Sequence, residues 1–167
     1  MAHAIKYHPG MALLEQFAEG CLNADVALAV AAHIDLCPHC QQLQRDITTD
    51  LAGRLMQQRL KPDNTNWDAM LSDIMSQQEP AARAEVIEVP VQQVQVAGRE
   101  FTLPRALQRL ASKHGKWLQL GGIATAKIPA GSDYHISLLY ISKDTEVPQH
   151  THLGLEMTLV LAGKIAD

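Results

Sequence analysis

One stretch of the chain, His33-Ile34-Asp35-Leu36-Cys37-Pro38-His39-Cys40, has the spacing of a set of metal ligands. His33 and Cys37 are four residues apart, so on a helix their side chains project from one face. Pro38 lacks an N–H donor and ends that helix, but it suits the first turn of a new helix that carries Cys40. Zinc binds four nitrogen or sulfur ligands in a tetrahedron. The stretch therefore predicts a zinc site that takes three ligands from here and a fourth from elsewhere.

Two other interpretations of the cysteine pair stay open, a redox-active Cys-x-x-Cys and inert thiols that fill a core. A redox pair usually follows a strand, whereas residues 23–36 are rich in alanine and helical in character. With His33 in register, the pattern favours zinc. The third cysteine, Cys21, is expected to pack in the core.

The composition changes near the middle of the 167 residues, which predicts two domains, 1–79 and 80–167. The first half has a net charge of −5 and is rich in Ala, Leu and Gln, whereas the second has +1 and more Val, Ile and Gly. An acidic domain argues against a nucleic-acid surface and for a basic protein partner. We expect an α+β protein with a helical first half and a β-rich second half.

The chain shows no signal peptide, because its first twenty residues contain no apolar h-region. Three cysteines in such a chain predict a reducing compartment, and we expect a cytoplasmic protein. No apolar run approaches the roughly 20 residues that span a bilayer, so no membrane segment is expected.

Four helices are predicted in the first half, over 11–19, from Asn23, over 38–58 and from Asn66. The third repeats an apolar residue every four positions, at Leu43, Ile47, Leu51 and Leu55. The fourth follows a break at 61–65 and carries an apolar stripe of Trp67, Met70, Leu71 and Ile74. Such a stripe either packs in a core or docks in a groove of a partner, and the pattern leaves both open.

The second half is predicted to be mostly antiparallel β, a sandwich or barrel. The expected strands are 86–89, 94–96, 117–120, 123–128, 134–142 and 157–161, with a short helix over 104–113.

A second candidate metal site lies in this half. His150 and His152 alternate along one extended segment and so point to one face, where Glu156 is able to join them. Two histidines and a glutamate suit zinc, iron or manganese. An exposed polar turn with a chance pair of histidines is the alternative.

The two motifs together resemble the ChrR-type zinc-binding anti-sigma factors, in which a helical anti-sigma domain precedes a C-terminal cupin domain. The N-terminal resemblance rests on His8, Leu13-Leu14, Phe17-Ala18-Glu19-Gly20, Ala31-Ala32-His33 and Leu36-Cys37, which follow in the same order. It implies that the fourth zinc ligand is His8. His3 lacks this alignment, and His39, between the cysteines, is expected to point away from the site.

The second half resembles the cupin part of the same proteins through His150, His152, Glu156 and Gly163, which fit the first cupin motif. Asp144 stands where general cupin patterns have a glycine, and the chain stops at Asp167, before the second motif. We therefore expect an incomplete jelly roll, a weak second divalent metal site, and self-association through the open edge of the sheet.

The resemblance implies a non-enzymatic function, in which the protein sequesters an extracytoplasmic-function (ECF) sigma factor until a stress signal, singlet oxygen in the family, is sensed. The first rival is a cupin metalloenzyme such as a dioxygenase, which an open metal site with substrate-dependent turnover would favour. A second rival, a nucleic-acid-binding zinc module, is disfavoured by the acidic first half.

Overall fold

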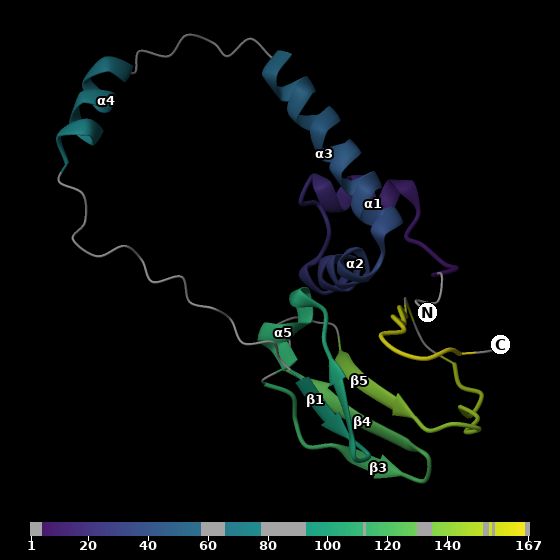
Figure 1. The fold of residues 1–167 in the computed structure, drawn as a ribbon. Coiled ribbons are helices and arrows are strands. Elements are labelled where there is room, and N and C mark those ends of the chain that lie inside the picture. The colour runs from purple at the N-terminus through teal and green to yellow at the C-terminus, as the bar shows by residue number, and fades with distance from the viewer. Residues whose placement is uncertain are drawn as a thin grey trace.

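The structure is a computed structural model that describes residues 5–57, 66–77, 93–111, 113–129, 135–151, 154 and 156–165. Helices fill the first half, and antiparallel strands with one short helix fill the second (Figure 1). The α+β class predicted from the sequence is therefore confirmed. None of the described helices combines the length and apolar character needed to cross a bilayer.

Three helices pack together at the N-terminal end, α1 (Met11–Ala18), α2 (Ala24–Leu36) and α3 (Pro38–Gln57). Gly20 follows α1 at φ +72°, a left-handed conformation that stops a helix at little cost only for glycine. Leu14 and Val30 are almost fully buried where the three helices meet. Cys21 contradicts its prediction, because it lies exposed in the turn after α1 rather than in the core.

The apolar row of α3 is covered only along its first turns. Leu43, Ile47 and Leu51 are half-buried, whereas Leu55 is 62% exposed. Figure 1 shows the end of α3 extending past α1 and α2, which explains the loss of cover. The C-terminal part of this helix thus presents apolar side chains to solvent.

Helix α4 (Trp67–Ser76) begins where the sequence predicts, because the Asn66 side chain accepts a hydrogen bond from the Ala69 N–H at 3.0 Å. No residue of α4 is buried, and Figure 1 draws the helix apart from α1 to α3. Its predicted apolar stripe is therefore not part of a core among the described residues.

The second half contains two antiparallel sheets. Strands β1 (Gln93–Val96) and β2 (Arg99–Thr102) form a hairpin whose turn, Ala97-Gly98, has positive φ at both residues. Helix α5 (Arg105–Ala111) follows, and then β3 (Leu118–Leu120), β4 (Ile123–Ile128) and β5 (Ile136–Ile141) pair in the order β3-β4-β5.

Of the predicted strands, one is not tested and one is wrong. Residues 86–89 lie outside the described residues. Residues 157–161 are not a strand, so that prediction is wrong. Leu159 and Leu161 do alternate toward the core as strand residues would, but a strand also needs a hydrogen-bonded neighbour, and none pairs with this segment among the described residues.

One hydrophobic cluster joins the two halves of the chain. Ala32 of α2, which is fully buried, packs with Val94 of β1, Leu103, and Leu107 of α5. The side chains packed around this centre come from both halves as well: Leu28, Ala106, Trp117, Leu138, Leu159 and Leu161. Helix α2 is thus covered by α1 and α3 on one side and by α5 on another.

Candidate metal centre

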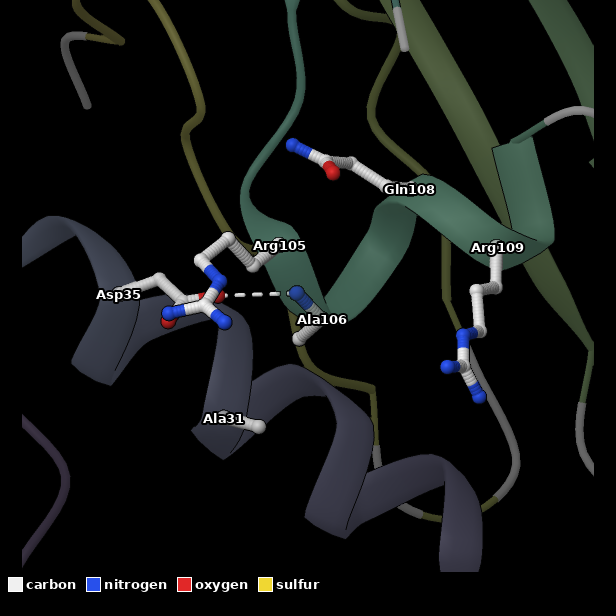
Figure 2. A pocket seen from close by; sticks show the side chains of 6 residues that line it. All are labelled: Ala31, Asp35, Arg105, Ala106, Gln108 and Arg109. Atoms are coloured by element: carbon white, nitrogen blue, oxygen red, sulfur yellow. Dashed lines mark hydrogen bonds between the residues drawn. The ribbon is translucent and has the colours of Figure 1, made fainter. Parts of the chain in front are cut away.

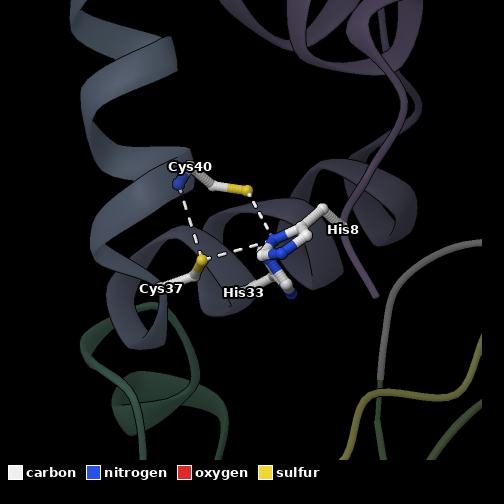
Figure 3. A group of neighbouring side chains, drawn as sticks. All are labelled: His8, His33, Cys37 and Cys40. Carbon is white, nitrogen blue, oxygen red and sulfur yellow. Dashed lines mark hydrogen bonds between the residues drawn. The ribbon is translucent and has the colours of Figure 1, made fainter. Parts of the chain in front are cut away.

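Four side chains converge where α2 ends and α3 begins. One ligand atom from each of His8, His33, Cys37 and Cys40 lies within 4.8 Å of the others. The Nδ1 atom of His8 is 3.4 Å from the Sγ of Cys37 and 3.4 Å from the Sγ of Cys40 (Figure 3). These four are the residues that the sequence and the family resemblance predict for zinc.

The backbone around Cys37 brings the ligands together. Cys37 is the C-cap of α2, with φ −115° and ψ 104°, so it lies just past the helix on which the sequence places it. Its N–H still donates to the His33 carbonyl at 2.9 Å, which keeps the two side chains one above the other. Pro38 then starts α3, and the Cys40 N–H donates to the Cys37 Sγ at 3.5 Å. His8 reaches the site from the non-helical segment before α1.

Burial sets the chemistry of the group. His33, Cys37 and Cys40 are buried and His8 is exposed. Burial, together with the positive charge of His8, lowers the pKa of His33, which keeps its imidazole neutral and able to bind a metal. Burial raises the pKa of the Cys40 thiol to about 11, and the hydrogen bond and charge of Cys37 add to this effect. A cation at the site would oppose this increase in pKa, because it stabilises the thiolate over the protonated thiol.

The geometry fits a tetrahedral zinc ion. Zn–N and Zn–S bonds of roughly 2.1 and 2.3 Å at a tetrahedral angle place nitrogen and sulfur about 3.6 Å apart, close to the observed 3.4 Å. The Nε2 atom of His33 is buried and has no hydrogen-bond partner among the described residues. A buried ring nitrogen is costly without a partner, and a metal ion would supply one. The set would be a closed four-ligand site of the structural type.

His39 is described by the structure, and it is not one of the four converging residues. His3 lies outside the described residues. His39 contributes no ligand atom, as predicted, but its ring stands 5.0 Å from the ring of His8, measured between centroids, so it flanks the site instead of pointing clear of it. The ring of His33 also lies near His8, with 5.7 Å between the centroids. The ring of His8 thus lies near two other imidazole rings.

The second predicted metal site is only partly visible. His150 and Glu156 are exposed, and His152 lies outside the described residues. The Nδ1 atom of His150 is 2.8 Å from the carbonyl oxygen of Pro148. Within the described part of the chain, neither His150 nor Glu156 belongs to a group of three or more ligands, so this site stays a prediction.

The four converging side chains on a small helical unit, followed by a β-rich half, define a two-part protein whose helical part carries a group compatible with a closed Cys₂His₂ zinc site. No protein-family model matches the chain. It is 31% identical to the anti-sigma-E factor ChrR of Cereibacter sphaeroides, over 98% of this chain and 73% of that protein. The chain belongs to the family of ChrR anti-sigma factors.

The fold agrees with this assignment. The crystal structure of Rhodobacter sphaeroides SigE in complex with the anti-sigma ChrR matches 80% of this chain with a TM-score of 0.51 and 22% sequence identity. The chain spans 64% of the length of the chain it matches there. At this identity the likeness concerns the fold.

Proposed function

We propose that the protein is a cytoplasmic anti-sigma factor that binds an ECF sigma factor and keeps it from RNA polymerase until a stress signal arrives. The relationship to ChrR over nearly the whole chain is the observation that carries this proposal. In this function the protein is not an enzyme and contacts no nucleic acid directly. Singlet oxygen or another oxidative stress is the class of signal we expect.

We further propose a division of labour between residues 1–79, as a four-helix zinc-binding anti-sigma domain, and residues 80–167, as a cupin-like domain of jelly-roll type. The antiparallel pairing of β3, β4 and β5 supports the second assignment. The convergence of His8, His33, Cys37 and Cys40 supports zinc in the first. The zinc would be structural, because four protein ligands leave no open position for a reacting water.

The surface proposed for the sigma factor is the apolar stripe of α4. Trp67, Leu71 and Ile74 are each more than half exposed, and Met70 is nearly so. Exposed apolar helix faces of this kind fit hydrophobic grooves, and tryptophan is favoured among interface hot spots. The exposed end of α3, with Leu55 and Met56, would extend the same contact. The net charge of −5 on residues 1–79 suits basic sigma-factor surfaces and would speed association.

A direct binding experiment tests the function. The zinc-loaded protein is immobilised, and each ECF sigma factor of the source organism is passed over it, with the primary sigma factor as the negative control. We expect one ECF sigma factor to bind tightly and its promoter-specific transcription in vitro to fall in proportion to the protein added. Binding to none of the ECF sigma factors would contradict the proposal.

A further inference from the structure

Asp35 lies in an unusual place for an acidic residue. It belongs to the last turn of α2, between the metal-site residues His33 and Cys37. The free carbonyl groups at a helix C-terminus carry partial negative charge, so a carboxylate there is unfavourable for its own helix. Asp35 therefore does not stabilise the helix to which it belongs.

The partner of Asp35 is the start of α5 in the other half of the chain. The Oδ2 atom of Asp35 accepts a hydrogen bond from the backbone N–H of Ala106 at 2.9 Å (Figure 2). Ala106 is the second residue of α5, and the first N–H groups of a helix have no intrahelical acceptor. Asp35 thus caps α5 from another element, with its negative charge at the positive end of that helix.

Apolar packing beside the hydrogen bond completes the contact. Ala32 lies one turn before Asp35 on α2 and is fully buried against Leu103 and Leu107. Apolar packing alone has no direction, and a two-helix contact made only of small and branched side chains tolerates sliding. The hydrogen bond from Ala106 to Asp35 therefore defines the register of α5 on α2.

We propose that Asp35 is a positioning residue that couples the metal centre to the β half. It lies on the turn that carries His33 and leads into Cys37, so any shift of that turn moves the cap of α5 and two metal ligands together. Coupling of this kind is reciprocal. Docking of α5 stabilises the end of α2 that carries the metal ligands, and metal binding at that end stabilises α5. The inference rests on the proposed zinc site. Through the contact between Asp35 and Ala106, the β half is able to regulate the helical half.

The expected effect of removing the Asp35 carboxylate depends on how exposed its contact with Ala106 is. A cavity of about 390 Å³ opens along the seam between α2 and α5, lined by Ala31, Asp35, Arg105, Ala106, Gln108 and Arg109. Asp35 is itself exposed, so water competes for its carboxylate. Loss of an N-cap typically changes an equilibrium by about fivefold, and we expect an effect of that order here.

The experiment uses the zinc-loaded full chain and two readouts. Hydrogen exchange followed by mass spectrometry reports the protection of amides in residues 104–111, and zinc transfer to a chromophoric chelator reports the metal centre. Asp35→Ala should raise exchange in this segment about fivefold and speed zinc transfer. Asp35→Asn keeps a capping oxygen and should restore both readouts. Asp46→Ala is the matched control, since within the described ranges that exposed carboxylate accepts a local hydrogen bond from Gln42 on α3 and none from the β half.

The reverse direction is tested by removing zinc from the wild type, which should raise exchange of α5 although no α5 residue is a proposed ligand. Leu107→Ala weakens the same contact between α2 and α5 but leaves the sequence of the helical half unchanged. It should also speed zinc transfer. If Asp35→Ala and Leu107→Ala both transfer zinc at the wild-type rate, the proposed coupling is wrong. It is also wrong if Asp35→Asn does not restore the wild-type rate of zinc transfer. A wild type that holds no tight zinc would overturn the metal assignment and the coupling with it. Neither readout involves sigma-factor binding. The coupling can therefore be refuted while the sigma factor still binds, and it can be confirmed while no sigma factor binds.

Discussion

The Nδ1 atom of His8 lies 3.4 Å from the Sγ of Cys37, although the two residues are 29 positions apart in the sequence. The segment before α1 reaches the junction of α2 and α3, and its exposed His8 completes the ligand set. A metal at this point would tie three separate segments together.

Removing both thiols should remove the metal and much of the helical structure together. A closed zinc site contributes directly to folding, because the unfolded chain has no preformed site. We expect Cys37→Ser with Cys40→Ser to lose bound zinc, measured by atomic absorption, and helical content, measured by circular dichroism. Cys21→Ser is the control, because that cysteine is exposed and outside the group. Full zinc occupancy in the double variant would refute the site.

Zinc binding should release protons near neutral pH. Without metal the pKa of Cys40 is raised to about 11, so its thiol is protonated, and zinc binds the thiolate. The pKa of His33 is lowered by burial and by His8, so this imidazole is already neutral at pH 7 and releases little. The apparent affinity should therefore rise about tenfold per pH unit for each thiol proton released. Calorimetry at pH 7 in buffers of different ionisation enthalpy measures the number released, and a value of zero would contradict the prediction.

The exposed stripe of α4 should contribute to partner binding and little to the stability of the free protein. We expect Trp67→Ala with Leu71→Ala to weaken the sigma-factor complex roughly thirtyfold, on the basis of about 1 kcal/mol for each anchor. Zinc content and the thermal midpoint of the free protein should stay unchanged, since both side chains are exposed. Ser72→Ala, on the opposite side of the same helix, controls for changes in helix propensity. Unfolding of the free double variant would show that the stripe is core after all.

The second metal site should bind weakly. His150, His152 and Glu156 offer three ligands, and His150 and Glu156 are exposed, so water competes for these two ligands. A titration of the Cys37→Ser, Cys40→Ser variant with Zn²⁺, Mn²⁺ and Fe²⁺ isolates this site from the first. We expect sub-stoichiometric or weak binding that disappears in the further variant His150→Ala, His152→Ala. One tightly bound equivalent in a monomeric Cys37→Ser, Cys40→Ser variant would prove the expectation wrong.

Self-association through the β half is a separate expectation, and sedimentation velocity over a range of protein concentrations tests it. A single monomeric species at all concentrations would contradict self-association.

Much of the metal centre is readable in the sequence because its determinants are local. The four-residue step from His33 to Cys37 and the break at Pro38 depend only on helix geometry and on the missing proline N–H. The start of α4 at Asn66 and its apolar stripe are local in the same sense. His8 is different, since only the family resemblance, and no spacing, pointed to it.

The tertiary structure decided what depends on distant parts of the chain. It left the α4 stripe exposed and placed Cys21 at the surface, and among the described residues it gave 157–161 no neighbour of the kind a strand requires. It also gave Asp35 a partner 71 residues away, at Ala106. Periodicity and ligand spacing report the geometry of a few consecutive residues. Burial, strand pairing and capping between elements depend on how the whole chain returns on itself, which no short stretch of sequence contains.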